Sequence, residues 1–315
     1  MKLIKEFVEN DKICQNFLVN NVTRGITAKG SGYLNIILQD ASGTMEAKKW
    51  EIEENDEKII KVVNIILVEG DVLLYKNDFQ LKVSKVSSVS DAELDVSQFV
   101  ASAPVSRNDL QKVLFEYVEK ITNVEIKRVV EEVIKDHYIS LSNYPAATKN
   151  HHEYAAGLLH HTTTMLRVGE LLSGVYSVNT SLLYAGIILH DIGKTIELSG
   201  PILPKYTVAG KLIGHISIIS AEVAETCKRL GVDSEISVLL QHMILSHHGQ
   251  YDFGSPVLPM TKEAEMLHFI DNLDSKMNII DKALNAIDEG EFTSRQFALE
   301  DRNFYKPNLK ENDYE

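Results

Sequence analysis

The chain has 315 residues, of which 44% are hydrophobic and 24% are charged, a composition typical of a globular protein with more than one domain. Its two cysteines, Cys14 and Cys227, lie far apart in no CxxC pair, which excludes a disulfide framework and a thiolate zinc site and favours a reduced, cytoplasmic compartment. The formal net charge of -13 excludes a protein that coats nucleic acid through charge alone.

The N-terminal sequence MKLIKEFVENDKIC is charged along its length and lacks the apolar core of a signal peptide. No later run approaches the roughly eighteen consecutive apolar residues that a membrane span requires. We therefore expect neither secretion nor membrane association.

Residues 1–90 are predicted to form the first domain. Within them, β-forming segments are separated by turn residues, and Leu34, Ile36 and Leu38 alternate with polar or exposed positions. This pattern predicts roughly five strands. The charged segment EIEENDEKIIKVV, between the third and fourth strands, has apolar residues at helical spacing. Three strands, a helix and two strands is the order of an OB-fold β-barrel.

The serine-rich segment 91–109 has no sustained apolar period and is predicted to be a linker. From Leu110 onward the apolar period becomes helical. We expect a helical lead-in at 110–150, an all-α domain at 151–290 and a tail at 291–315. The expected fold is therefore multidomain α+β, with an N-terminal five-stranded OB-fold barrel followed by an all-α helical bundle.

Histidines in the helical region stand where a helix directs them inward or ends. In EYAAGLLHHTTTMLRVGELL, helical geometry places His161 on the apolar face and His160 on another. A core histidine held by a carbonyl is the simpler explanation of His161 taken alone. His190 and Asp191 follow the apolar run LLYAGIIL, and both can reach one ion beyond the helix end. A capping or surface aspartate is the alternative, but the inward histidine beside it favours metal binding.

Two further segments add imidazoles. GKLIGHIS places His215 at the start of a helix, where a solvent-facing polar residue is an equal alternative. In VLLQHMILSHHGQ, the pair His247 and His248 ends a helix before a glycine, an arrangement that can present two imidazoles to one metal. His242 lies off the face of His247 and is predicted to be structural or to lie behind the ligands.

The segment AEMLHFIDNLDSKMNIIDKALNAID adds carboxylates. Either Asp271 or Asp274 would make a suitable ligand, and periodicity does not select between them. The same helix carries an apolar stripe formed by Met266, Phe269, Ile270, Leu273, Met277 and Ile280. Mixed imidazole and carboxylate ligands suit ions such as Mn2+ and Fe.

The ordered series GLLHHT, LHDIGK, GHIS, LSHHGQYDFGSP and FIDNLDSKM, within residues 145–285, resembles the HD-domain superfamily of metal-dependent phosphohydrolases. A barrel, a linker and an HD domain in a chain of this length resemble the YhaM family of 3'-to-5' exoribonucleases, also described as cmp-binding factor. The resemblance implies Mn2+-dependent removal of nucleotides from the 3' ends of single-stranded RNA, and also of DNA. It also implies that His161, not His160, is the first ligand and that Asp271, not Asp274, is the late carboxylate.

The resemblance implies one or two divalent ions, Mn2+ or Fe. The first ion would be held by His161, His190, Asp191 and Asp271. Asp191 would bridge to a second ion held by His215, His247 and His248. Asp191 and Lys194 are the candidate catalytic residues, with Lys194 placed to contact the scissile phosphate as a point charge. A solvated lysine past a helix end is the alternative for Lys194.

The barrel supplies candidate nucleic-acid contacts, because OB-folds bind single strands by stacking bases on aromatic side chains beside a basic groove. The candidates are Tyr33, Trp50, Lys48, Lys49, Tyr75 and Lys76. Tyr33 and Trp50 are favoured for stacking. The expected partner is single-stranded RNA or DNA, and a homo-oligomer is left open because HD enzymes often self-associate.

Two other functions fit parts of the sequence. A small-nucleotide or cyclic-dinucleotide phosphohydrolase fits because HHGQYDFGSP also resembles the loop after the paired histidines in HD-GYP enzymes. The barrel disfavours that function, since a small ligand needs no strand-binding platform. A non-enzymatic, DNA-binding replication accessory factor is the other alternative, and the complete series of ligands disfavours it.

Overall fold

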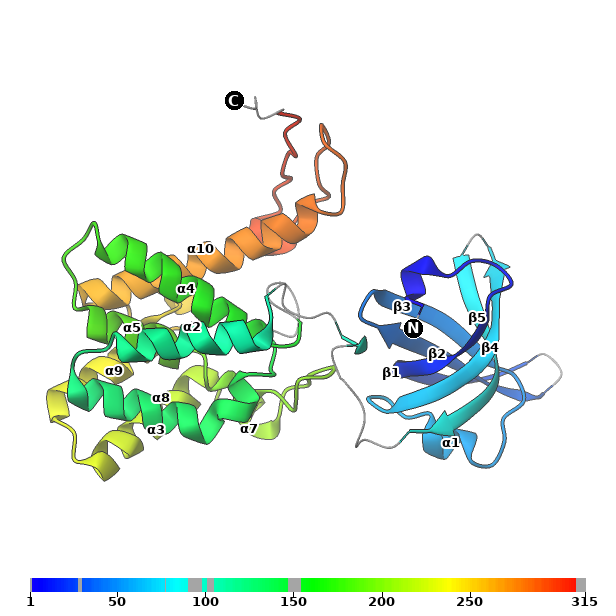
Figure 1. The fold of residues 1–315 in the computed structure, drawn as a ribbon, viewed down its shortest axis with the longest axis horizontal. Helices are drawn as coiled ribbons and strands as arrows, with labels where there is room; N and C mark the ends of the chain where they lie inside the picture. Colours follow the sequence, from blue (N-terminus) through cyan, green and yellow to red (C-terminus); the bar gives the residue numbers. More distant parts are fainter. Residues whose placement is uncertain are drawn as a thin grey trace. The chain divides into compact units, whose positions relative to one another are not determined.

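The structure is a computed structural model, and it describes residues 2–27, 30–76, 78–89, 98–100, 105–146 and 154–309. The chain divides into two compact units, Met1–Ser102 and Ala103–Glu315. Most of the predicted linker at 91–109 lies outside the described residues. Figure 1 labels the helices and strands of both units.

The first unit is a closed barrel with the strand order β1-β2-β3-β5-β4 (Figure 1). Its strands are β1 (Lys12–Ile26), β2 (Gly32–Asp40), β3 (Gly43–Lys49), β4 (Ile65–Tyr75) and β5 (Asp78–Ser88). Strands β3 and β5 pair in parallel, and the other pairs are antiparallel. Helix α1 (Asp56–Ile59) lies between β3 and β4, and the short helix η1 (Ile4–Glu6) precedes β1. The predicted five-stranded OB-fold barrel, with a helix before its fourth strand, is confirmed.

The alternation in β2 is confirmed, because Leu34, Ile36 and Leu38 are all buried in the barrel core. The helix before β4 is shorter than its apolar spacing suggests. It ends at Ile59, and Val63 has a φ of 77°, a left-handed conformation that no α-helix contains. Apolar residues three positions apart in a non-helical turn can therefore have the same spacing as residues of a helix, which makes the predicted helix too long.

Residues 98–100 belong to the barrel, although the sequence places them in the linker. Phe99 is fully buried, and its carbonyl oxygen accepts a hydrogen bond of 3.1 Å from the side chain of Gln39. The backbone N–H of Ala41 also donates to the carbonyl oxygen of Gln98 at 3.0 Å. An aromatic anchor and two hydrogen bonds thus extend the barrel beyond its last strand.

The second unit is an all-α bundle, as predicted. Its helices are α2 (Arg107–Glu119), α3 (Val124–Leu141), α4 (Gly157–Ser173), α5 (Thr180–Leu189), α6 (Lys194–Glu197), α7 (Val208–Leu212), α8 (His215–Leu230), α9 (Ser234–Ser246) and α10 (Lys262–Leu284), with the short helices η4 (Tyr251–Phe253) and η5 (Phe297–Leu299). Most of the longer helices begin at a residue whose side chain accepts a hydrogen bond from the first turn. These caps are Ser106, Asn123, Asn179, Asp233 and Thr261.

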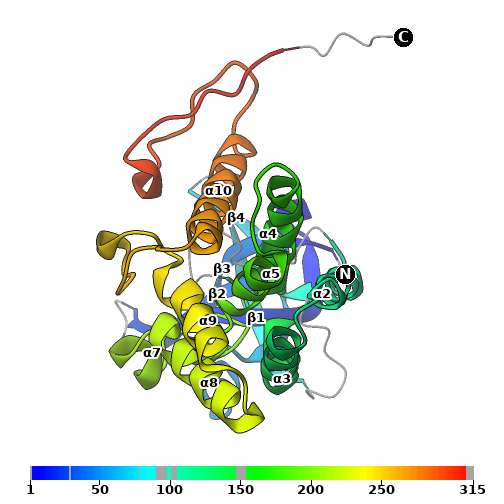
Figure 2. The same ribbon diagram turned by 90° about the vertical axis from the view of Figure 1, so that its left-hand side faces the viewer.

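Helix α5 lies in the middle of the bundle, in contact with α2, α3, α4, α9 and α10 (Figure 2). Residues 181–189 are all buried, which explains why this helix has no polar face. Gly186 permits close packing of α9, since a Cβ at Gly186 would lie 2.3 Å from Cε of Met243. The last turn of α5 therefore delivers His190 and Asp191 into the interior of the bundle.

The buried face of α10 differs from the predicted apolar stripe. The buried residues of this helix are Ala264, Leu267 and Ile270. Three members of the stripe are instead exposed by 60%, 49% and 46%, namely Phe269, Leu273 and Met277. The helix has apolar residues on two sides, so the apolar pattern alone could not identify the side that packs against α4 and α5.

After α10 the chain folds back on itself up to residue 309. Isolated bridges pair Phe292 with Tyr305 and Gln296 with Arg302. The rings of Phe292 and Tyr305 lie 5.0 Å apart. The predicted tail at 291–315 thus begins with a paired segment, and residues 310–315 lie outside the described part of the chain.

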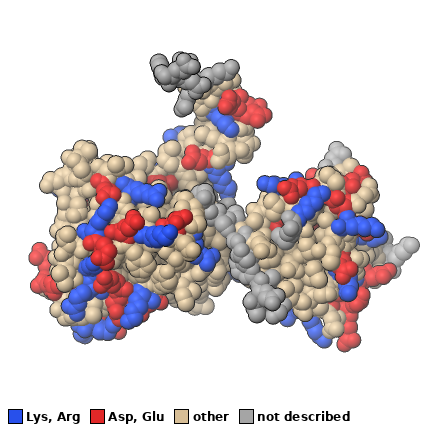
Figure 3. Space-filling model, viewed as in Figure 1, with Lys and Arg blue, Asp and Glu red and all other residues tan. Residues whose placement is uncertain are grey.

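Charges of both signs lie side by side on the face of the helical unit shown in Figure 3. Lys112 lies 3.3 Å from Asp109, and Lys127 lies 2.7 Å from Glu119. Basic and acidic groups of this unit thus compensate each other in these pairs. Across the described residues, no helix combines the length and the apolar character needed to cross a membrane.

Candidate metal centre

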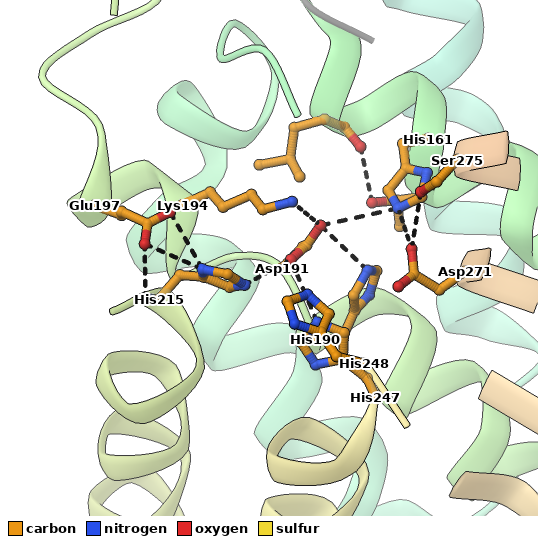
Figure 4. Close-up of polar contacts among 12 residues, drawn as sticks. His161, His190, Asp191, Lys194, Glu197, His215, His247, His248, Asp271 and Ser275 are labelled. Atoms are coloured by element: carbon orange, nitrogen blue, oxygen red, sulfur yellow. Dashed lines mark hydrogen bonds and ion pairs between the residues drawn. The ribbon is translucent and has the colours of Figure 1, made fainter. Parts of the chain in front are cut away.

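The seven predicted ligands come together in the helical unit (Figure 4). His161 comes from α4, His190 and Asp191 follow α5, and His215 is the first residue of α8. His247 and His248 follow α9, and Asp271 lies within α10. Four of these side chains are almost completely buried. His161, His190 and His247 have no exposed surface, and Asp191 is 2% exposed. Burying so many polar groups is unfavourable unless they bind one another or an ion.

Hydrogen bonds at Nδ1 determine which ring nitrogens carry a proton. His190 Nδ1 lies 2.8 Å from the carbonyl oxygen of Ile187, and His247 Nδ1 lies 2.7 Å from that of Ile244. His248 Nδ1 likewise lies 2.7 Å from a backbone carbonyl oxygen in the loop that follows. A carbonyl oxygen only accepts, so Nδ1 carries the hydrogen in each ring. The lone pair of Nε2 is therefore available to a metal.

Several ligand atoms have no hydrogen-bond partner within the described part of the chain. They are Nε2 of His190, His215 and His247 and Oδ1 of Asp191, all buried. Buried polar atoms are nearly always satisfied, so such a cluster requires an explanation. A divalent ion would satisfy these atoms together, since imidazole nitrogens and carboxylate oxygens are metal donors.

The ligand atoms form two groups that share Asp191. The atoms of His161, His190 and Asp191 lie within 4.8 Å of one another, as do those of His215, His247 and His248. Oδ2 of Asp191 lies 3.3 Å from His190 Nε2, whereas Oδ1 lies 3.3 Å from His215 Nε2. Each carboxylate oxygen thus faces one group, which is the geometry that a bridging ligand requires.

The two carboxylates of α10 lie on opposite sides of His161. Asp271 Oδ1 lies 3.2 Å from His161 Nε2, and Asp274 Oδ2 lies 2.6 Å from His161 Nδ1. Nε2 is the nitrogen that faces Asp191, at 3.8 Å. Asp271 therefore lies on the inner side with the other ligand atoms, and Asp274 lies behind the ring.

Burial and local charge set the protonation states. Burial opposes the charged form of His161, but Asp271 and Asp274 outweigh it and raise its pKa to about 10. Burial, together with the neighbouring imidazoles, lowers the pKa of His247 well below its usual value. Burial opposes ionisation of Asp191, but the charges of Lys194 and His190 outweigh it and hold the pKa of that carboxyl far below its usual range. A neutral His247 and an ionised Asp191 are the states that metal binding requires, whereas His161 must lose a proton when an ion binds.

Lys194 is an internal residue. Its ammonium nitrogen lies 2.6 Å from Asp191 Oδ2, and its side chain is only 12% exposed. Burial opposes its charge, but Asp191 outweighs this effect and raises the pKa of Lys194. The alternative of a solvated lysine past a helix end is therefore wrong. The short helix α6 begins at this residue and turns its ammonium group toward the ligands (Figure 4).

On the barrel, four of the predicted nucleic-acid contacts gather on one surface. The Lys48 ammonium lies 6.0 Å from the ring centroid of Tyr33 and 5.6 Å from those of Trp50 and Tyr75. The rings of Tyr33 and Trp50 are 4.9 Å apart and inclined by 33°. Trp50 and Tyr75 are 43% and 53% exposed. We call these four residues the aromatic platform.

Two features extend and support the aromatic platform. A Cβ at Gly25 would lie 2.3 Å from Cζ of Tyr33, so only glycine lets that ring lie across strand β1. A cavity of about 700 Å³ adjoins the platform and is lined by Tyr75, Lys76 and Phe79 among others. The Lys76 ammonium lies 5.5 Å from the Tyr75 ring. Aromatic and cationic groups therefore continue from the platform to the β4–β5 turn.

Lys49 is not part of this surface, and its prediction as a nucleic-acid contact is wrong. It is 4% exposed, with its ammonium 3.7 Å from Asp56 and donating to the carbonyl oxygen of Ser84 at 3.0 Å. Neighbouring residues in a strand point to opposite faces of the sheet, so Lys48 and Lys49 cannot both face outward.

Comparison with known proteins identifies the family. The HD domain family matches residues 158–276, which include every ligand described above. The 3'-5' exoribonuclease YhaM of Bacillus pumilus is 44% identical over 312 residues, covering 98% of this chain and 99% of that protein. The protein of the same name from Bacillus subtilis is 44% identical over 299 residues, covering 94% of this chain and 95% of its own. The chain belongs to the YhaM family.

Among solved structures, the second OB-fold domain of replication protein A from Methanococcus maripaludis is similar to 29% of this YhaM-family chain. The match covers 96% of that domain, with 18% identity and a TM-score of 0.24.

His242 and Glu197 of this YhaM-family chain are not among the seven predicted ligands, and each makes a defined hydrogen bond. His242 Nε2 accepts a hydrogen bond of 2.9 Å from the backbone of Met260, which agrees with the predicted structural role. Glu197 was not anticipated. Its Oε1 lies 3.2 Å from His215 Nδ1 and accepts from the backbone N–H of His215, also at 3.2 Å. The only sequence signal for a role of Glu197 was its position one helical turn after Lys194, which places the two side chains next to each other on one helix.

Proposed function

We propose that this protein is a metal-dependent 3'-5' exoribonuclease that hydrolyses phosphodiester bonds of single-stranded RNA, and also of single-stranded DNA, from the 3' end. The convergence of buried, unsatisfied ligand atoms on Asp191 carries this proposal. The relatives named 3'-5' exoribonuclease YhaM support the direction of cleavage and the substrate class. Two free cysteines are consistent with action in the reducing cytoplasm.

The ligand set fits one or two divalent ions. His161, His190, Asp191 and Asp271 would hold the first ion. His215, His247 and His248 would hold the second, with Asp191 shared between both. The mixture of nitrogen and oxygen donors suits Mn2+ or Fe. When bound, such ions supply a water that is nucleophilic near neutral pH and relieve the charge on the phosphate.

Two residues of the chain have roles of their own in this mechanism. Asp191 stays ionised and directs one oxygen to each ligand group. It therefore fixes the position of the two ligand groups relative to each other. Lys194 brings a buried positive charge to the same carboxylate. We expect its ammonium group to contact the scissile phosphate, because a cation in a buried site stabilises an approaching anion more than a solvated one does.

The aromatic platform is the proposed strand-binding surface. Bases would stack on Tyr33, Trp50 and Tyr75, while Lys48 and Lys76 neutralise phosphates beside them. A local basic and aromatic surface of this kind overcomes the repulsion expected from the acidic chain.

The proposal is tested with 5'-labelled single-stranded RNA and metal-free protein, before and after addition of Mn2+. We expect products that shorten from the 3' end only when metal is present. Asp191→Asn should abolish this cleavage while leaving RNA binding intact. Asp288→Asn changes an exposed carboxylate of the same unit and should cleave like the wild type. Intact RNA under all metals, or cleavage of a cyclic dinucleotide alone, would refute the exoribonuclease assignment.

A further inference from the structure

The five ligand histidines are held at Nδ1 in two different ways. His190, His247 and His248 use backbone carbonyl oxygens, as described above. His161 and His215 use carboxylates, Asp274 at 2.6 Å and Glu197 at 3.2 Å. One carboxylate-held imidazole therefore belongs to each ligand group.

Position along the helices explains the difference. His190 and His247 immediately follow α5 and α9, where the last carbonyl groups have no helical partner and can accept from the ring. His161 lies within α4, where the helix itself uses the carbonyl groups, and His215 begins α8, where the free backbone groups are N–H donors. These two rings need an acceptor from another element to orient them.

We propose that Glu197 and Asp274 are positioning residues, one for each metal ion. Glu197 orients His215 toward the group that contains His247 and His248, and Asp274 orients His161 toward the group that contains His190. The inference rests on the proposed metal-dependent function. A carboxylate behind a metal-binding imidazole fixes the tautomer and orientation of the ring and strengthens it as a donor.

Both carboxylates are themselves fixed in place. The side chain of Glu197 is 12% exposed and accepts from both the ring and the backbone of His215 (Figure 4). Gly210 of α7 packs closely against it, because a Cβ there would lie 2.9 Å from Cγ of Glu197. The side chain of Asp274 is 9% exposed and lies behind His161, away from Asp271. Neither carboxylate can replace a ligand without leaving its histidine.

The test is titration of metal-free, full-length protein with Mn2+, with free Mn2+ measured by electron paramagnetic resonance. We expect wild-type protein to bind two ions. Glu197→Gln and Asp274→Asn keep the side-chain shape and remove the charge, and each should weaken one ion by about 10- to 100-fold while leaving the other unchanged. In a His248→Ala background, where we expect the second ion to be lost, Asp274→Asn should weaken the remaining ion and Glu197→Gln should not.

Glu222→Gln is the matched control, because Glu222 lies 2.7 Å from His137, a histidine outside the ligand set. It should leave both Mn2+ affinities unchanged. Wild-type protein that binds no Mn2+ would contradict the proposed function itself. Wild-type protein that binds two ions, with variants that bind both equally well or lose both equally, would overturn only the present inference. Thermal unfolding of the metal-free variants separates a loss of folding from a loss of affinity, and each variant tests its own half independently.

Discussion

Gly193→Ala should disable the metal centre without replacing any of the proposed ligands. The backbone of Gly193 has φ -55° and ψ -20°, an ordinary right-handed conformation that alanine adopts without strain. By itself this change would stabilise the fold by about 0.4–1 kcal/mol, because alanine restricts the unfolded chain. The close packing around Gly193 removes this expected gain in stability. A Cβ there would lie 2.3 Å from the carbonyl oxygen of His215 and 2.9 Å from its carbonyl carbon.

The magnitude follows from this contact. Real Cβ contacts are not shorter than 3.0 Å, so the backbone of His215 must move by at least about 0.7 Å. No flexible side chain can yield instead, since both atoms are backbone. Functional constellations tolerate errors of about 0.5 Å, and a misplacement of 1 Å costs about 100-fold in rate. We therefore expect kcat to fall by about 100-fold and RNA affinity to stay unchanged.

Initial rates of RNA shortening at saturating Mn2+ provide the assay. Gly200→Ala is the control, because Gly200 follows in the same segment and has no atom within 4 Å of an added Cβ. It should cleave at the wild-type rate. If Gly193→Ala cleaves as fast as Gly200→Ala, the close approach of the two backbones does not position His215, and the reasoning fails.

Three further predictions concern the barrel and the metal. Lys48→Ala should weaken RNA binding and lower its salt dependence by about one phosphate contact. Lys49→Ala removes the cation beside the buried carboxylate of Asp56 and should lower the unfolding free energy of the barrel by about 3 kcal/mol. RNA titrations and denaturant unfolding of both variants check this, and equal effects would contradict it. Trp50→Ala should raise the Kd for single-stranded RNA by about 5- to 150-fold, the equivalent of one stacked base, and an unchanged anisotropy titration would exclude stacking. Mn2+ at about 100 times its Kd should stabilise the helical unit by about 2.7 kcal/mol, and an equal rise in unfolding temperature for Asp191→Asn would show that the ion binds elsewhere.

Much of the architecture follows from local pattern. The alternation at residues 33–39 predicted the inner face of β2, and the change to a helical period marked the second unit. Helical geometry also placed His161 inward, and Leu34 and His161 are both fully or almost fully buried. These predictions succeed because a residue's direction relative to its own strand or helix depends on the backbone period alone.

The sequence pattern could not identify the buried side of an element when both of its sides carry similar residues. On α10 the exposed Phe269 and the buried Ile270 are both apolar, and only the packing against α4 and α5 chooses between them. The same rotation places Asp271 on the inner side of His161 and Asp274 behind it. Lys48 and Lys49 are also identical in type and adjacent in sequence, and the barrel surface decides which one meets solvent.

The sequence by itself determined the two-part fold and indicated the candidate imidazole and carboxylate ligands, because period, capping and ligand type are properties of short segments. Only the tertiary structure decided that Asp274 lies behind His161 and that Glu197 lies behind His215. Such contacts join helices that are far apart in the chain, and they depend on how closely neighbouring elements pack, as at Gly193 and Gly210.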